Sequence, residues 1–196
     1  MSHYFSQENS TIKSNPKRIA FRAHNEDFIC VSDHGVFAKD NLDRGTKVLL
    51  DHLVVPTGTT TVLDLGCGYG PIGLVLAKVY GLDVDMIDVN PRALALAKTN
   101  LEENNVVANV FASDGFEQVE KSYDLIVTNP PIRVGKPKLY DLLQSTYEHL
   151  VDSGELWFVI HKNHGAKSAL QFIQTVYGNV TVVGRDKGFQ IIRCQK

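Results

Sequence analysis

Cysteine is scarce in this chain of 196 residues, and its three copies lie far apart. Cys30, Cys67 and Cys194 form no C-x-x-C pair, so the sequence offers neither a disulfide framework nor a cysteine-based zinc site. His161 and His164 have a spacing that can bind a metal, but no cysteine or carboxylate stands beside them to complete a ligand set. We therefore expect no metal, a reducing cytoplasm as the location, and both histidines on the surface or against a substrate.

Long apolar runs are also missing, because no stretch approaches the length needed to span a bilayer. Residues 1–14 are polar and lack the apolar middle of a secretory signal. The sequence therefore predicts no membrane association, and it gives no indication of an oligomeric state.

An excess of positive charge is absent as well, since the net charge is −2 at pH 7. Basic residues are nevertheless grouped along the chain. Each group alone is typical of a solvated surface, but together they are compatible with a basic rim that holds a phosphate backbone. The groups are Lys13, Lys17, Arg18 and Arg22; Arg133, Lys136 and Lys138; and Lys162, Lys167, Arg185, Lys187, Arg193 and Lys196.

Neither an internal repeat nor a long linker divides the chain, which predicts a single domain over residues 1–196. Residues 1–56 read as an extension: alternating runs over 18–22 and 27–31 predict a small β-hairpin. A loop over 35–45 follows, and then a helix from Thr46, a plausible N-cap, to about Val54.

Residues 57–196 alternate between strand and helix patterns and form the predicted core. Short strands joined by crossover helices predict a doubly wound, mostly parallel, seven-stranded sheet with an antiparallel last strand, which is a Rossmann-like α/β fold. The expected strands cover 61–65, 84–88, 109–112, 124–128, 155–160, 180–183 and 189–194, and the expected helices cover 72–80, 91–103, 139–151 and 164–177.

A glycine-rich loop follows the first core strand and opens directly into a helix. Gly66, Gly68 and Gly70 alternate, which permits tight turns and leaves no Cβ to block a ligand on the loop. A dinucleotide fingerprint requires a third glycine where Pro71 stands, and Asp64 would place a carboxylate near its phosphates. The pattern favours a cofactor that is positively charged and lacks phosphates, such as S-adenosylmethionine, over a nicotinamide dinucleotide.

The next two strands also end in carboxylates, where an open α/β sheet binds its ligands. Asp88 comes about twenty residues after the glycine loop, which is the place of a ribose ligand, although an Asp at a strand end is often only a helix cap. Asp114, in Ser113-Asp114-Gly115, is a weaker candidate for an adenine amino group, because such turns are common.

The fourth strand ends in the expected catalytic residues, Asn129, Pro130, Pro131 and Ile132. The Asn129 side-chain oxygen and the Pro130 carbonyl can accept the two hydrogens of a planar exocyclic amine and aim its lone pair at a methyl group. An Asp at position 129 would still accept hydrogen bonds, whereas Ala would not. An isolated Asn-Pro-Pro is merely a turn, but at this strand end it predicts methyl transfer to nitrogen.

With these motifs the chain resembles class I S-adenosylmethionine-dependent methyltransferases, and more narrowly the methyltransferase small-domain family. The resemblance covers nearly the whole chain and includes residues 35–37, 42–46, 62–70, 88–90, 129–136 and 162–166. It implies a pocket closed by Phe37 and residues 43–46. The expected cofactor-binding residues are Thr46, Asp64, Gly66, Cys67, Gly68, Gly70, Asp88, Val89, Asp114, Gly115 and Asn129, and the expected substrate-binding residues are Phe37, Arg133 and Lys136.

The resemblance implies methylation of guanine N2 in ribosomal RNA, with RNA or a ribosomal subunit as the partner. Two features depart from the family pattern: the longer ribosomal enzymes carry an additional N-terminal domain, and many relatives have an aromatic residue where Ile132 stands. Base stacking would then come from another aromatic, for which Phe37 is the candidate. Adenine N6 and a protein glutamine amide remain alternative substrates, and a non-catalytic RNA-binding module remains an alternative of another class.

Overall fold

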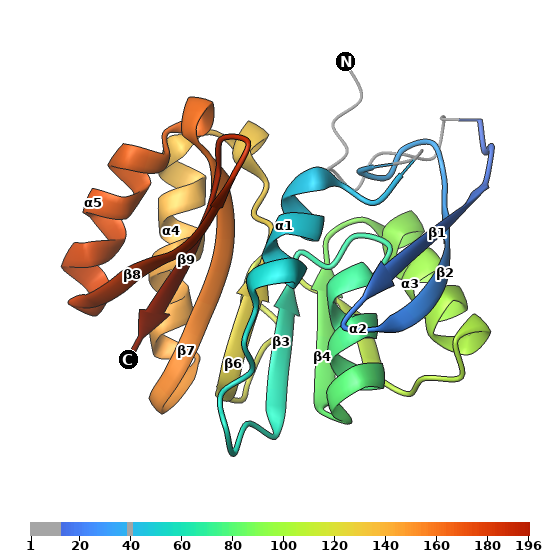
Figure 1. Cartoon of the computed structure of the whole chain (residues 1–196), viewed down its shortest axis with the longest axis horizontal. Coiled ribbons are helices and arrows are strands. Elements are labelled where there is room, and N and C mark those ends of the chain that lie inside the picture. The colour runs from blue at the N-terminus through green and yellow to red at the C-terminus, as the bar shows by residue number, and fades with distance from the viewer. Residues whose placement is uncertain (1–12, 39–40) are drawn as a thin grey trace.

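The computed structural model describes residues 13–38 and 41–196. A seven-stranded sheet with strand order β5-β4-β3-β6-β7-β9-β8 forms its centre, and β9 runs antiparallel to both neighbours while β3 to β7 are parallel (Figure 1). The predicted fold class is confirmed. The strands are β3 (Thr61–Leu65), β4 (Asp83–Asp88), β5 (Asn109–Ala112), β6 (Tyr123–Thr128), β7 (Leu150–His161), β8 (Asn179–Asp186) and β9 (Phe189–Gln195).

Helices cover both faces of the sheet and create two hydrophobic cores, one per face. One core contains α1 (Arg44–His52), α2 (Pro71–Tyr80) and α3 (Pro91–Glu103), and the other contains α4 (Lys136–Glu148) and α5 (Ala166–Tyr177). Neighbouring residues of one strand serve opposite cores: Val62 packs into the first and Leu63 into the second. Burial on both faces explains the continuously apolar strands of the sequence.

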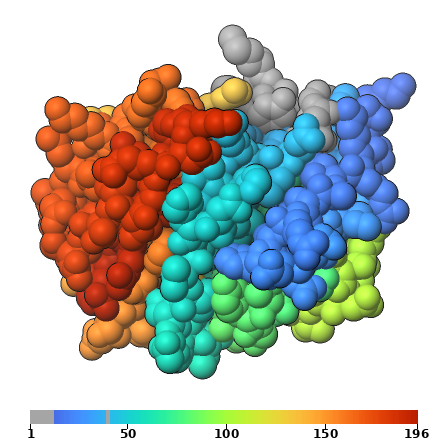
Figure 2. Space-filling model, in the orientation of Figure 1, coloured from blue at the N-terminus to red at the C-terminus, as the bar shows by residue number. Residues whose placement is uncertain are grey.

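The predicted hairpin consists of β1 (Lys17–Ala23) and β2 (Glu26–Ser32). In Figure 2 this blue hairpin and the cyan α1 adjoin the green α2, on the face of the first core. Two asparagines at the C-terminal end of α3 extend the hairpin: Asn100 in the last turn of the helix and Asn104 at its C-cap. Asn100 exchanges hydrogen bonds with the backbone N–H (2.6 Å) and carbonyl (3.0 Å) of Val31, and Asn104 does the same with Ile29 (3.4 and 2.8 Å). The two amides thus act as a substitute strand along the open edge of β2.

Several element boundaries differ from the sequence prediction: β7 begins at Leu150 instead of Glu155, β8 ends at Asp186 instead of Val183, and the helices α1 and α4 differ at both ends. The N-cap of α1 is Asp43 and not Thr46: the Asp43 carboxylate accepts from the Thr46 N–H at 2.9 Å, and the helix begins at Arg44 and ends at His52. Helix α4 covers 136–148 instead of 139–151. It starts earlier because Pro137 suits a first helical turn, and it ends earlier because Leu150 pairs with Tyr123 as the start of β7.

Some expectations concern residues whose structure is not described. The polar start of the chain includes residues 1–12, and the loop over 35–45 includes residues 39 and 40; these lie outside the described residues. The start of that loop is held against the first turn of α3, because Asn90 donates to the carbonyl of Gly35 (3.0 Å) and Arg92 to that of the preceding His34 (2.6 Å).

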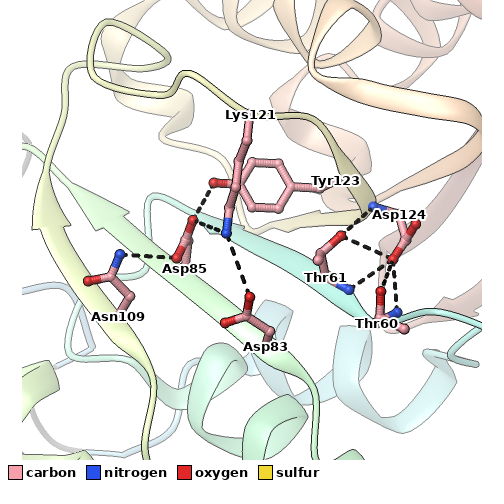
Figure 3. Close-up of polar contacts among 8 residues, drawn as sticks. All are labelled: Thr60, Thr61, Asp83, Asp85, Asn109, Lys121, Tyr123 and Asp124. Atoms are coloured by element: carbon pink, nitrogen blue, oxygen red, sulfur yellow. Dashed lines mark hydrogen bonds and ion pairs between the residues drawn. The ribbon is translucent and has the colours of Figure 1, made fainter.

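A carboxylate network lies at the amino ends of the parallel strands (Figure 3). Asp85 of β4 is buried, and it accepts hydrogen bonds from the Tyr123 hydroxyl at 2.6 Å and the Asn109 amide at 3.1 Å. Asp85 also forms an ion pair with Lys121, whose Nζ lies 3.0 Å from Asp85 Oδ2. Three partners therefore compensate the burial of this charge.

Asp124, the second residue of β6, joins the same edge to the start of β3 (Figure 3). One carboxylate oxygen accepts four hydrogen bonds of 2.8 to 3.0 Å from the N–H and hydroxyl groups of Thr60 and Thr61. These bonds, with the Thr61 N–H foremost, lower the pKa of Asp124 to about 2.

Candidate functional site

The glycine loop between β3 and α2 has one open side. Gly66 and Gly68 have positive φ angles of 73° and 57°, and a Cβ added at either would meet no atom within 4 Å. Gly70 differs, because its Cβ would lie 2.5 Å from Cε of Met86. Only the first two glycines therefore leave room for a ligand. Gly70 instead lies against Met86 and Ala97 and has a φ of 92°, which corrects the single explanation expected for all three.

Asp64 ends up behind this loop instead of in front of it. Its side chain is fully buried, Oδ2 accepts from the Gly73 N–H in the first turn of α2 at 2.8 Å, and Oδ1 has no hydrogen-bond partner. Burial raises the pKa of Asp64 to about 7. A carboxylate thus already occupies the helix N-terminus where a dinucleotide phosphate would bind.

Asp88 ends the neighbouring strand β4 beside the loop. Its two oxygens accept from the Gly68 N–H at 2.9 Å and the Asn90 N–H at 2.8 Å. Burial raises the pKa of Asp88 in spite of these bonds. The carboxylate joins the glycine loop to the start of α3 and keeps lone pairs for a further donor.

Two cavities meet at the carboxyl ends of β3, β4 and β6. Gly66, Asp88 and Asn129 line both of them. The narrower cavity is also lined by Phe37, Thr46, Cys67 and Gly68, among others. The wider one has a volume of about 730 Å³ and is also lined by Val89, Asp114, Gly115 and Pro131. The fold therefore brings most of the predicted site residues to one place.

The remaining predicted residues do not line either cavity. Asp64 and Gly70 lie behind the glycine loop, and Pro130 is buried. Ile132 is half-buried in a 3₁₀ turn over Ile132–Val134 and packs against the second core. Arg133 and Lys136 are exposed beyond it.

Asp114 lines the wider cavity but has a partner that the sequence did not reveal. Lys138, at the start of α4, lies 3.3 Å from its carboxylate, and both side chains are about half exposed. Lys138 lines the same cavity. It therefore belongs with the cavity and not with Arg133 and Lys136 on the surface.

Asn129 is held from the side by the first turn of α1. Its amide nitrogen Nδ2 donates to Asp43 Oδ2 at 2.8 Å and to Thr46 Oγ1 at 3.0 Å. Thr46 was expected to bind a cofactor, yet its hydroxyl accepts from Asn129. Asp43 was expected only to help close the pocket, and its bond to Asn129 is the contact that sequence reasoning missed. The preference for Asp as an N-cap was the available signal for its place at the helix start.

A cluster of aromatic rings lies next to α1. Phe189 at the start of β9 packs edge-on against His161, with ring centroids 4.8 Å apart, and the His161 ring lies 5.3 Å from the His164 ring.

Within residues 13–38 and 41–196, no three His, Cys, Asp or Glu side chains are placed to hold a metal ion. Over the same residues, the three cysteines are buried and form no disulfide, and no helix is long and apolar enough to cross a membrane.

Comparison with known sequences decides the family. Residues 27–193 match the family described as the methyltransferase small domain. The chain belongs to the methyltransferase small-domain family. The resemblance inferred from the glycine loop and Asn-Pro-Pro is thereby confirmed.

The relatives that the chain matches differ in length. The chain is 41% identical over 200 residues to the uncharacterized protein YbxB of Bacillus subtilis, and covers all of both sequences. It is 34% identical to ribosomal RNA small subunit methyltransferase C of Shewanella denitrificans, over 83% of this chain but only 47% of that protein. The chain thus spans about half the length of these named methyltransferases.

Solved structures show the same fold. The 16S rRNA N2 G1207 methyltransferase of Thermus thermophilus, in complex with AdoMet and guanosine, superposes with a TM-score of 0.83 over 92% of this chain and 50% of that one, at 23% identity. A ribosomal protein L11 methylase from Lactobacillus delbrueckii superposes with a TM-score of 0.64 over 80% of this chain and 84% of that one, at 20% identity. At these identities the likeness establishes the fold alone.

Proposed function

We propose that this chain is an S-adenosylmethionine-dependent N-methyltransferase whose substrate is guanine N2 in ribosomal RNA. The observation that carries the proposal is the position of Asn129, which lines both cavities at the point where they meet. A methyl donor in one part of this space and an amine in the other would face each other across this side chain.

The cavities suit S-adenosylmethionine by the chemistry of their walls. Gly66 and Gly68 offer open backbone, and Asp88 is a hydrogen-bond acceptor at the place of a ribose. Asp43, Asp88 and Asp114 put carboxylates around the space, which favours a cationic ligand over a polyphosphate. Asp64 strengthens this preference because it fills the anion site of α2.

In this proposal S-adenosylmethionine, when bound, supplies a methyl group already activated by its sulfonium. The chain contributes positioning. Asp88 would hold the ribose hydroxyls, and Asp114 would accept from the adenine amino group in the wider cavity. The Asn129 side-chain oxygen and the Pro130 carbonyl would accept the hydrogens of the target amine and direct its lone pair.

Ribosomal RNA as the substrate is supported by the names of the relatives and by the charge around the cavities. The longer relatives are named ribosomal RNA methyltransferases. Arg133 and Lys136 are exposed beside the Asn129 segment, where they could contact phosphates. A target guanine must be unpaired or flipped out, and Phe37, 42% exposed at the narrower cavity, would stack on it.

The test is methylation of small-subunit ribosomal RNA and of assembled small subunits by the purified chain with labelled S-adenosylmethionine. The products are digested to nucleosides and identified by mass spectrometry, and the RNA of a gene-deletion strain is examined in parallel. We expect N2-methylguanosine at a position that loses its methyl group in the deletion strain. Detection of N6-methyladenosine would instead identify adenine as the substrate, and label in protein would favour the glutamine amide. Either result would contradict guanine N2. RNA binding without transfer would favour the non-catalytic alternative.

A further inference from the structure

Asp43 and Asn129 are 86 residues apart in the sequence, and their side chains form a hydrogen bond in which Asn129 is the donor. We propose that Asp43 is a positioning residue for methyl transfer, which fixes the Asn129 side chain so that its oxygen faces the cavities. The inference rests on the proposed function, because it concerns the orientation of the group that would accept the target amine.

The chemistry of a carboxylate sets that direction. An asparagine amide has a donor end and an acceptor end, and the two can exchange by a flip of the side chain. Asp43 Oδ2 can only accept, so Asn129 must turn its nitrogen toward it, at 2.8 Å. In the flipped side chain, the Asn129 oxygen would lie at this distance from Asp43 Oδ2, and two acceptors cannot form a hydrogen bond. Hydrogen bonding to Asp43 therefore excludes the flip that would put a donor where the amine needs an acceptor.

Thr46 completes the arrangement. The Asn129 nitrogen carries two hydrogens, and its second bond goes to the Thr46 hydroxyl at 3.0 Å. Both hydrogens are therefore used within the protein. The amide oxygen is the only polar atom of the side chain left to act on a substrate.

The first turn of α1 keeps Asp43 itself in place. The same Oδ2 atom accepts from the Thr46 N–H at 2.9 Å, which requires an oxygen at this position. Gly45 allows the turn to lie close, because a Cβ there would be 2.9 Å from Asp43 Oδ2 and 3.5 Å from Asn129 Nδ2. The helix cap and the orientation of Asn129 thus depend on one carboxylate oxygen.

Two substitutions separate these roles. Asp43→Ser keeps a good N-cap, but its shorter side chain does not extend to Asn129. Asp43→Asn is the conservative partner: the Thr46 N–H would hold its oxygen at the present position, where it could still accept from Asn129. We expect single-turnover methyl transfer at saturating S-adenosylmethionine to fall by about 10-fold or more in the Ser variant and to stay within about 3-fold of native in the Asn variant.

Thermal unfolding and S-adenosylmethionine affinity are measured on the same variants. We expect the unfolding temperature to be nearly unchanged in Asp43→Ser, since the cap remains. The affinity should fall to a similar degree in Asp43→Ser and Asp43→Asn, because both variants lose the same carboxylate at the narrower cavity. A native transfer rate in Asp43→Ser would overturn the proposal. A fall in rate that the Asn variant shares would overturn it too, because both variants would then lack something other than the oriented hydrogen bond.

A second measurement keeps this inference independent of the proposed function. The Asn129 side-chain NH₂ gives ¹⁵N–¹H resonances, whose hydrogen exchange should be slow in the native chain and Asp43→Asn and faster in Asp43→Ser. If the native chain transfers no methyl group while this pattern holds, the proposed function fails and the positioning by Asp43 stands. Equal exchange in the native chain and Asp43→Ser would refute the positioning whatever the activity.

Discussion

The two edges of the parallel sheet use aspartate in opposite ways. At the amino edge, Asp85 has three polar partners and one oxygen of Asp124 accepts four hydrogen bonds. At the carboxyl edge, Asp64 has one buried oxygen without any partner, and burial raises the pKa of both Asp64 and Asp88. The pKa of Asp124, by contrast, is lowered to about 2.

This difference separates stability from function within one residue type. A buried carboxylate with a full set of donors cross-links the strands it joins, whereas an incompletely satisfied one costs folding free energy. Asp88 lines both cavities, together with Gly66 and Asn129, whereas Asp64 lies behind the glycine loop. We infer that the carboxyl edge is built for a ligand that donates hydrogen bonds to Asp88, and that the amino edge is built for stability alone.

The largest expected effect concerns Asn129. Asn129→Ala removes the side-chain acceptor, and we expect methyl transfer to fall by ~100-fold or more, as on loss of one preorganised polar contact. S-adenosylmethionine affinity should change much less, because the glycines and Asp88 remain. The measurement is single-turnover methyl transfer at saturating cofactor to the RNA identified as the substrate. A native rate would show that Asn-Pro-Pro is only a structural turn.

Asn129→Asp distinguishes the sequence-based expectation from the structure-based one. The sequence favours retained activity, since Asp still accepts hydrogen bonds. In the structure the new carboxylate would face Asp43, whose oxygen lies 2.8 Å from the present nitrogen. Two like charges at this distance repel each other, so we expect an activity as low as that of Asn129→Ala. Activity near native would show that Asp43 does not constrain position 129.

The next effect concerns cofactor affinity. Asp88→Ala should weaken S-adenosylmethionine binding by about 10-fold or more, because charge-assisted hydrogen bonds to the ribose would be lost. The matched control is Asp124→Ala at the amino edge, which should leave the affinity unchanged. Calorimetric titration of both variants makes the comparison, and equal losses in the two would erase the proposed difference between the edges.

RNA affinity should respond to surface charge beside the Asn129 segment. We expect Arg133→Glu/Lys136→Glu to weaken RNA binding several-fold and to reduce its salt dependence, with cofactor affinity unchanged. Lys138 stays native because it pairs with Asp114 at the cavity. Lys98→Glu, on the exposed side of α3, changes the net charge by as much as either single substitution, Arg133→Glu or Lys136→Glu, and is the control for each of them. Filter binding over a range of salt concentrations tests this. Unchanged RNA binding would show that Arg133 and Lys136 are solvated surface residues without a role in RNA binding.

The smallest effect is on stability at the amino edge. Asp124→Asn should lower the free energy of unfolding by ~0.5–1 kcal/mol at pH 7, because an amide replaces a carboxylate that accepts four hydrogen bonds. Methyl transfer should not change, and a loss of transfer with stability intact would contradict the assignment of this edge to stability.

The pH dependence of that deficit follows from the shift in pKa. The folded pKa of Asp124, about 2, lies below the ordinary value of 3.8, so its ionised form stabilises the fold above about pH 4. This stabilisation is lost as the pH falls through 3.8 toward 2. Urea unfolding at pH 7, 5 and 3 should therefore show the deficit of Asp124→Asn shrinking at the lowest pH, and a deficit that grows there would contradict the shift.

Much of the fold could be predicted from the sequence, because strand and helix patterns alternate from Thr61 onward. The boundaries of α1 and α4 could not, since they depend on competition between neighbours: Asp43 competes with Thr46 for the cap, and Leu150 pairs with β6 instead of extending a helix. The edge partners Asn100 and Asn104 were not predictable either, because their bonds to β2 join segments about 70 residues apart.

The candidate site shows the same division. Strand ends and glycines predicted which residues gather at the cavities, because that follows from topology. The local sequence could not show that Asp64 faces α2, that Gly70 lies against Met86, or that Asp43 and Thr46 bond to Asn129. Each of these contacts depends on tertiary packing between separate elements.

The central claim, that the carboxyl edge is a site for a cationic nucleoside cofactor and not for a dinucleotide, is tested most directly by calorimetric titration of the unmodified chain. S-adenosylmethionine, its demethylated product and NAD are titrated in turn under identical conditions. The account predicts saturable binding of the first two at one site, with no measurable binding of NAD at the same concentrations. Preference for NAD, or no binding of S-adenosylmethionine, would contradict it.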